Sequence, residues 1–156
     1  SEEVPSFLPD RFEPGTPNIP GILGLHAALC DLEQTDMGKL HQHELELTQY
    51  FINGLMQMDP SESTLRAIGK HNTIERTSVV SVQTLQTDMA RVAYERDDTY
   101  GIMTRVGLHC APSAHKTLGT YPEGTIRFSF GPENTHHEVD LALHALAEIT
   151  GSPYHL

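Results

Sequence analysis

The sequence predicts an α/β domain of the α+β kind, with the element order strand-strand-helix-strand-strand-helix and its helices packed on one face of the sheet. Three observations support this fold class. Two short β-type runs begin near residue 65, two alternating segments follow them, and a well-capped amphipathic helix ends the pattern. An extended arm and a long helix precede this domain.

Prolines are frequent in the first twenty residues, and each one fixes φ and removes a backbone donor. We therefore expect an extended arm there. Apolar residues at helical spacing then begin at Ile22, and a second apolar stripe runs from Leu40 to Met58. The Asp59-Pro60 pair stops that helix. These boundaries predict an arm over 1–20, bridging helices over 21–59 and a small C-terminal α/β domain over 60–156.

The small domain opens with the runs LRAIG and TSVVSV, which are typical of strands. An amphipathic stretch from about 88 to 98 follows, and its inner face would carry Met89, Val92 and Ala93. The segment GLHCAPSAHKTLGT comes later and contains the glycines and prolines of a loop.

Two alternating strands are expected on either side of that loop, at about 102–106 and 125–130. Alternation leaves Arg105 and Arg127 off the core face, with Ile126 and Phe128 pointing into the core. The last helix has the clearest signals, because Thr135 and Glu138 form a capping box before its apolar stripe and a glycine follows it.

The formal net charge of -11 makes nucleic acid and anionic membrane surfaces poor partners, since the long-range field repels both. No stretch approaches the roughly 20 apolar residues of a membrane span. The first residues also lack the basic end and apolar run of a signal peptide. We therefore expect a cytoplasmic protein that binds neither nucleic acid nor membrane.

The chain has two cysteines, Cys30 and Cys110, in such different contexts that no disulfide framework is suggested. Cys110 lies in the loop segment beside His109, His115 and Lys116, and protonatable neighbours of this kind favour a reactive thiolate. A small buried cysteine without a chemical role is the alternative interpretation.

Histidines near Cys110 also raise the possibility of a zinc site, with more imidazole in the pairs 41/43 and 136/137. Adjacent residues such as His109 and Cys110 rarely bind one tetrahedral ion, and the chain has no Cys-x-x-Cys pair. We therefore expect no metal site and interpret most of these histidines as surface residues.

The arm motif RFEPGTPN places Gly15 before Thr16, an arrangement that can present an amide and a hydroxyl to an anion. A plain turn followed by an N-cap at Asn18 explains the same letters. The residues alone favour that turn.

Three segments together resemble the class V aminotransferase family, in particular its cysteine desulfurase-like branch of fold type I pyridoxal-phosphate enzymes. They are RFEPGTPNIPGILGL, YGIMTRVGLHCAPSAHKTLGT and GTIRFSFGPENTHHEVD, and they span nearly the whole chain. The resemblance implies that the chain is the C-terminal part of such an enzyme.

Residue by residue, the resemblance makes Cys110 the nucleophile that takes sulfur from cysteine as a persulfide and releases alanine. It makes Arg127 the residue that binds the substrate carboxylate and Arg105 a second active-site arginine. Physical chemistry agrees, because a thiolate is a competent sulfur nucleophile and a guanidinium fits a carboxylate with two hydrogen bonds. Gly15 and Thr16 would contact the cofactor phosphate of a neighbouring subunit, which implies a homodimer.

Members of this family hold pyridoxal phosphate through a lysine of a large domain upstream of RFEPGTPN, so we expect this chain by itself to bind no cofactor and to be inactive. His115-Lys116 imitates the family's His-Lys pair but follows Cys110, and Lys116 is better interpreted as a loop cation. Expected partners are the missing large domain, the substrate cysteine and a sulfur-acceptor protein. A class V aminotransferase, a selenocysteine lyase-type enzyme and a noncatalytic dimerisation or docking module remain alternatives.

Overall fold

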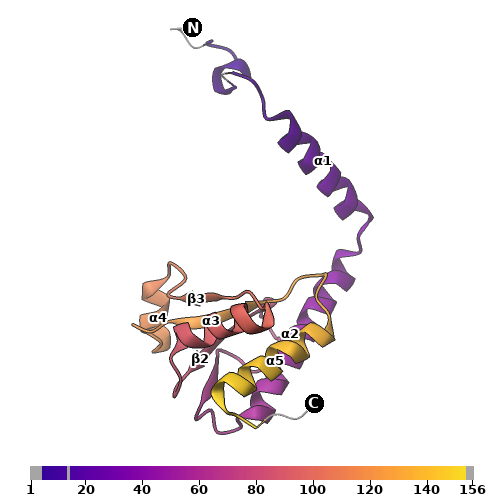
Figure 1. The fold of residues 1–156 in the computed structure, drawn as a ribbon. Helices are drawn as coiled ribbons and strands as arrows, with labels where there is room; N and C mark the ends of the chain where they lie inside the picture. The colour runs from indigo at the N-terminus through magenta and orange to yellow at the C-terminus, as the bar shows by residue number, and fades with distance from the viewer. Residues whose placement is uncertain (1–4, 14, 154–156) are drawn as a thin grey trace. The chain divides into compact units, whose positions relative to one another are not determined.

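The computed structural model describes residues 5–13 and 15–153, and the chain divides into two compact units, Ser1–Met37 and Gly38–Leu156. The first unit holds a 3₁₀ turn, η1 (Asp10–Phe12), and helix α1 (Ile19–Gln34). The remaining elements are α2 (Met37–Met58), β1 (Leu65–Ile68), β2 (Val79–Thr84), α3 (Met89–Tyr100), β3 (Arg105–Gly107), α4 (Pro112–Leu118), β4 (Thr125–Ser129) and α5 (His136–Thr150) (Figure 1).

The four described strands form one antiparallel sheet of order β1-β2-β4-β3, so the expected α+β fold class is confirmed. One row of paired residues crosses the whole sheet, and all of its members are apolar. They are Ala67, Val82, Ile126 and Val106. Because paired residues share a face, this row places the core on one side of the sheet and leaves the opposite side polar.

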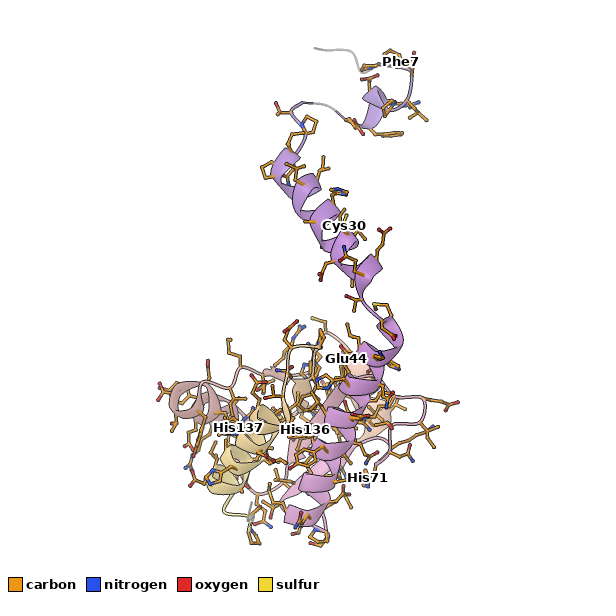
Figure 2. The ribbon with its side chains drawn as sticks, turned by 90° about the vertical axis from the view of Figure 1, so that its right-hand side faces the viewer. Phe7, Cys30, Glu44, His71, His136 and His137 are labelled. Carbon is orange, nitrogen blue, oxygen red and sulfur yellow. The ribbon has the colours of Figure 1, made fainter. Side chains whose placement is uncertain are left out.

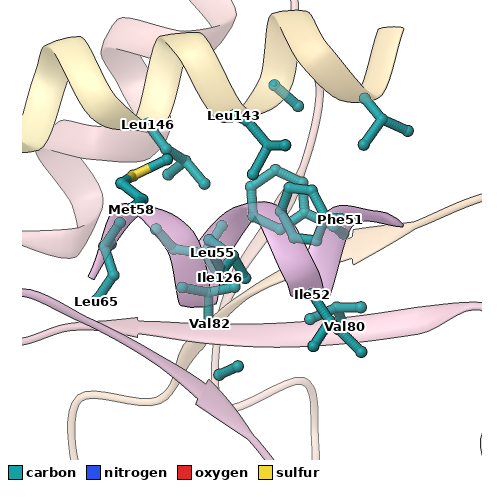
Figure 3. Packing of buried hydrophobic residues seen from close by; sticks show 14 of the residues in the cluster. Phe51, Ile52, Leu55, Met58, Leu65, Val80, Val82, Ile126, Leu143 and Leu146 are labelled. Atoms are coloured by element: carbon teal, nitrogen blue, oxygen red, sulfur yellow. The ribbon is translucent and has the colours of Figure 1, made fainter. Parts of the chain in front are cut away.

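Helices α2 and α5 supply much of the core that covers the apolar face of the sheet. Figure 3 shows Phe51 of α2 between Leu143 of α5 and Val80 of β2, and all three side chains are fully buried. The Phe51 ring also lies 4.7 Å from the ring of Phe128, centroid to centroid. Helix α2 therefore belongs to the compact unit Gly38–Leu156, although the division of the complete protein at residue 59 stays a prediction.

Helix α2 ends at Met58, as the Asp59-Pro60 pair predicts, and the Asp59 carboxylate stabilises the loop that follows. Asp59 accepts hydrogen bonds from the Thr64 and Leu65 amides at 2.6 and 3.0 Å, which sets the entry into β1. Burial opposes ionisation, but these bonds and one from Ser61 outweigh it and hold the pKa of Asp59 well below its usual range.

Two boundaries differ from those expected. Strand β3 begins at Arg105 rather than near residue 102, and the segment before it stays unpaired because the Ile102 amide bonds the Arg96 carbonyl instead. The glycine-rich loop contains a helix, α4. Pro112 in its first turn and left-handed Gly119 at its end are ordinary start and stop signals of a helix. Because only six residues separate them, the segment was expected to be a loop rather than a two-turn helix.

Arg96 is fully buried, which the sequence pattern did not predict. Its guanidinium lies 4.7 Å from the Phe128 ring centroid and donates to the Thr104 hydroxyl at 2.6 Å. These contacts compensate part of the lost hydration, and burial lowers the pKa of Arg96 to about 10. Arg96 follows the buried Val92 by four residues, so the helical period places both on one face.

Gly54 lies where α2 crosses α5, and a methyl group there would overlap the buried Leu143 side chain. We expect Gly54→Ala to lower the free energy of unfolding by about 1 kcal/mol or more, because overpacking outweighs the gain in helix propensity. Urea unfolding of the chain measures it. Gly24→Ala in α1 is the matched control, since its methyl would meet no atom within 4 Å, and it should not destabilise. Equal midpoints for the two variants would contradict the packing assignment.

Candidate functional site

Cys110 lies on a strained turn directly after β3. The Ala111 amide closes the turn by donating to the Leu108 carbonyl at 2.8 Å, and both central residues are left-handed, with φ of 51° at His109 and 61° at Cys110. Two consecutive non-glycine residues in this region are uncommon, and such strain is often found at functional sites. The thiol itself is free and exposed, so the expectation of burial in the alternative interpretation is wrong for Cys110, whereas its chemical role stays a prediction.

The turn sits against β4 because two glycines let the backbone approach closely. Gly107 ends β3 with φ of 104°, and Gly124 precedes β4 with φ of 85°. A Cβ on Gly124 would overlap the Gly107 carbonyl. This contact brings the first residue of β4, Thr125, next to the turn that carries Cys110.

Two buried threonines hold two histidines around the turn. His109 Nε2 lies 3.1 Å from the Thr125 hydroxyl, and His115 Nδ1 lies 2.7 Å from the Thr120 hydroxyl. The two imidazole rings are 5.7 Å apart, centroid to centroid. His115 on α4 is therefore buried, and the half-buried His109 contacts both His115 and the first residue of β4.

Burial lowers the pKa of His109, and the charges of Arg127, His115 and Arg105 lower it further. An imidazole in these surroundings is neutral at neutral pH. A neutral ring keeps one nitrogen as an acceptor and one as a donor, so it can bond the Thr125 hydroxyl in either tautomer.

Arg105 and Arg127 are directly paired across β3 and β4, and their side chains therefore share one face of the sheet. Ile126 and Phe128, on either side of Arg127, are buried, so the expected projection of Arg127 from the polar face is confirmed. Arg105 Nη2 reaches the Sγ of Cys110 at 3.5 Å. The structure thus brings the thiol, both arginines and His109 into one cationic cluster.

This cluster carries no compensating charge among the described residues. No carboxylate in that part of the chain pairs with either arginine, and the Nε of Arg127 is buried without a hydrogen-bond partner. Like charges placed opposite each other in a sheet destabilise it. An anionic group bound between the two guanidinium groups would relieve both problems, so the arrangement is suited to bind a carboxylate beside a sulfur nucleophile.

The arm residues lie in the other compact unit, Ser1–Met37. Gly15 is left-handed with φ of 93°, and both it and Thr16 are exposed. Asn18 caps α1 by accepting from the Gly21 amide at 3.1 Å, which confirms the expected N-cap. Cap and anion contact are compatible, because the cap uses Asn18 and leaves the Thr16 hydroxyl exposed.

The remaining candidates from the sequence are Lys116 and the histidines that were considered for a metal site. Lys116 is exposed, and its ammonium group lies 5.1 Å from the Tyr121 ring centroid. Figure 2 labels His136 and His137, which lie on α5, and His71, which lies in the β1–β2 connection. Within residues 5–13 and 15–153, no group of three His, Cys, Asp or Glu side chains could hold a metal ion. Nor does that part of the chain contain a helix that is long and apolar enough to cross a membrane.

The sequence pattern pointed to Cys110, and the family resemblance to Arg105 and Arg127, as candidate site residues, but neither indicated the contact of His109 with Thr125. This residue opens an alternating strand and gives no local signal of a contact with a residue 16 positions earlier. The only hint is the glycine before it, which permits the close approach of two backbones.

Comparison with known proteins assigns the chain to a family. Residues 2–142 match the model of the class-V aminotransferase family, and the chain belongs to that family. Among curated proteins, a probable cysteine desulfurase from Borreliella burgdorferi is 31% identical over 135 residues, which cover 86% of this chain and 31% of the relative. A probable cysteine desulfurase from Pyrococcus abyssi is 33% identical over 144 residues, 92% of this chain and 34% of the relative.

The solved structures that resemble this chain also include cysteine desulfurases. The apo structure of a cysteine desulfurase from Thermococcus onnurineus superposes with a TM-score of 0.79 at 34% identity, over 92% of this chain and 34% of that one. A cysteine desulfurase from Escherichia coli gives a TM-score of 0.69 at 26% identity, over 90% and 33% of the two chains. This chain therefore spans about a third of the length of the curated relatives that it matches.

The lowered pKa of His109 predicts a pH-dependent contribution to stability. The folded chain binds this proton less readily than the unfolded chain, so the contribution is complete above about pH 6.5 and is lost as pH falls through the folded-state pKa. We expect the difference in unfolding free energy between wild type and His109→Asn to shrink between about pH 7 and pH 5. Urea unfolding at several pH values measures it, and parallel pH profiles would contradict the assignment.

Proposed function

We propose that this chain is the part of a cysteine desulfurase that carries the sulfur nucleophile, and that Cys110 takes sulfur from the substrate cysteine. One observation carries the proposal: an exposed thiol on a strained turn lies 3.5 Å from the guanidinium of Arg105, in a cluster that also contains Arg127. The relatives named above support it, since they are described as cysteine desulfurases.

In the proposed reaction the thiolate of Cys110 attacks the sulfur of the substrate cysteine, and the bond between that sulfur and the substrate Cβ breaks. The sulfur remains on Cys110 as a persulfide. The three-carbon remainder takes up a proton and leaves as alanine. Arg105 lies where a cation can stabilise the sulfur anion at the start and at the end of this transfer.

Arg127 binds the substrate carboxylate in this proposal. Its guanidinium comes from the central strand β4, which is paired on both sides and therefore holds the side chain in a fixed direction. A planar guanidinium can donate two parallel hydrogen bonds to a carboxylate. Arg105 completes the substrate-binding pair, on the side nearer to Cys110.

Pyridoxal phosphate is the proposed cofactor, and when bound to the substrate amine it supplies an electron sink for the bonds that break. The left-handed Gly15 and exposed Thr16 fit a contact with its phosphate group, because they present an amide and a hydroxyl on an open backbone. Lys116 is not the residue that we propose to hold it, since its ammonium group stacks on Tyr121.

The proposed partners follow from these roles. The rest of the enzyme would supply the cofactor site, a second subunit would meet Gly15 and Thr16, and an acceptor protein would remove the sulfur from the exposed Cys110. The complete protein would act in the cytoplasm. Of the alternatives, a class V aminotransferase needs no thiol, so the placement of Cys110 beside Arg105 favours the desulfurase.

Cys110→Ser is the decisive variant, tested in the full-length enzyme. We expect it to lower alanine and sulfide release from cysteine by several orders of magnitude, because a hydroxyl cannot replace the sulfur nucleophile. Cys30→Ser is the matched control, since Cys30 is the other free cysteine and lies on α1 (Figure 2), and it should keep normal turnover. Near-normal turnover by Cys110→Ser would favour the aminotransferase.

Arg127→Lys tests the carboxylate contact. Lysine keeps the charge but cannot donate two parallel hydrogen bonds, so we expect kcat/KM for cysteine to fall roughly 10- to 100-fold, mainly through a higher KM. The matched control is Arg91→Lys on the exposed face of α3, whose partner is Glu95. An unchanged KM in Arg127→Lys would remove this residue from the substrate site.

A further inference from the structure

The turn that carries Cys110 adopts an uncommon left-handed conformation, which requires stabilising contacts with the surrounding structure. Its own closing bond, from the Ala111 amide to the Leu108 carbonyl, fixes the turn as a unit but not its direction relative to the sheet. The hydrogen bond between His109 and Thr125 ties the turn to the start of β4. Thr125 is 1% exposed and opens the central strand β4, so it is a rigid partner.

We propose that His109 is a positioning residue, which holds the turn through its hydrogen bond to Thr125 and thereby keeps the Sγ of Cys110 beside the guanidinium of Arg105. His109 and Cys110 are neighbours in the same turn. A rotation of the whole turn that breaks the hydrogen bond between His109 and Thr125 therefore also moves the thiol. The inference deepens the proposed function, because it rests on Cys110 as the sulfur nucleophile.

The surroundings of His109 suit a neutral holding residue. Arg105 of β3, Arg127 of β4 and His115 of α4 face its ring, and together with burial they disfavour the imidazolium. When this ring is neutral, the cation in contact with the sulfur is the guanidinium of Arg105, at 3.5 Å. The same ring packs 5.7 Å from the buried His115, which limits its freedom to turn away from Thr125.

The position of the thiol can be measured without turnover, by the charge preference of its alkylation. A thiol beside Arg105 reacts faster with anionic iodoacetate, relative to neutral iodoacetamide, than a thiol that has moved away from it. In the full-length protein, mass spectrometry of the Cys110 peptide gives both rates. We expect Arg105→Gln to lower their ratio by about fivefold, the effect of one close charge pair in water.

Thr125→Val keeps the shape and burial of the side chain and removes only the hydroxyl. We expect it to lower the alkylation ratio nearly as far as Arg105→Gln does, and Thr125→Ser to keep the wild-type ratio. His109→Asn tests the same bond from the other side, because asparagine tolerates the left-handed backbone but is too short for this contact. It should behave as Thr125→Val does.

Two comparisons distinguish positioning from general loosening of the loop. Thr120→Val removes the equivalent buried bond to His115 and should leave the ratio unchanged. In the Arg105→Gln background, Thr125→Val should have no further effect, since it acts only by moving the thiol away from Arg105.

An unchanged ratio in Thr125→Val, an equal fall in Thr120→Val, or a full additional fall in the double variant would each overturn the inference. None of these results depends on catalysis. Turnover by Cys110→Ser judges the proposed function separately.

Discussion

The antiparallel pairing of β3 with β4 is the constraint on which the whole candidate site depends. It sets Arg105 opposite Arg127 and joins the end of one strand to the start of the other through two glycines. The turn with Cys110 leaves β3 at this junction, and Thr125 enters β4 there. One short strand pair thus determines where the thiol, both arginines and His109 lie.

Side chains alternate between the two faces of a strand, so β4 contributes to the core with one face and to the candidate site with the other. Ile126 and Phe128 fill the core beneath α2 and α5, whereas Arg127 between them projects from the polar face. A register shift of one residue would bury the guanidinium and expose two apolar side chains. The apolar row that crosses all four strands therefore fixes the direction of Arg127 as firmly as it fixes the core.

Features encoded by local pattern could be predicted from the sequence. The capping box of Thr135 with Glu138, the helix stop at Asp59 and the alternation around Arg127 all appear in the structure. What could not be predicted depends on contacts between distant residues. The bond from His109 to Thr125 and the left-handed turn require the close approach of two strands, which neither segment encodes alone.

Helix α4 and Arg96 were missed for different physical reasons. Seven residues that begin with a proline and precede a glycine resemble a loop, because so short a helix has no room for an apolar stripe. Arg96 lies on the same face of α3 as the buried Val92. A charged residue is nevertheless expected at the surface, so its burial could not be predicted from the residue type. Only the structure reveals the Phe128 ring and the Thr104 hydroxyl that compensate its burial.

The candidate site itself contributes little to the stability of its unit. Its two arginines are like charges in direct cross-strand pairing, its turn holds two residues in a disfavoured region, and the buried Nε of Arg127 has no partner among the described residues. Stability comes instead from the core of Phe51, Leu143 and their neighbours on the other face of the sheet. An anion between the arginines would remove the repulsion and satisfy the unpaired donor. These features of the cluster support the proposal that a carboxylate binds between the two arginines, next to Cys110.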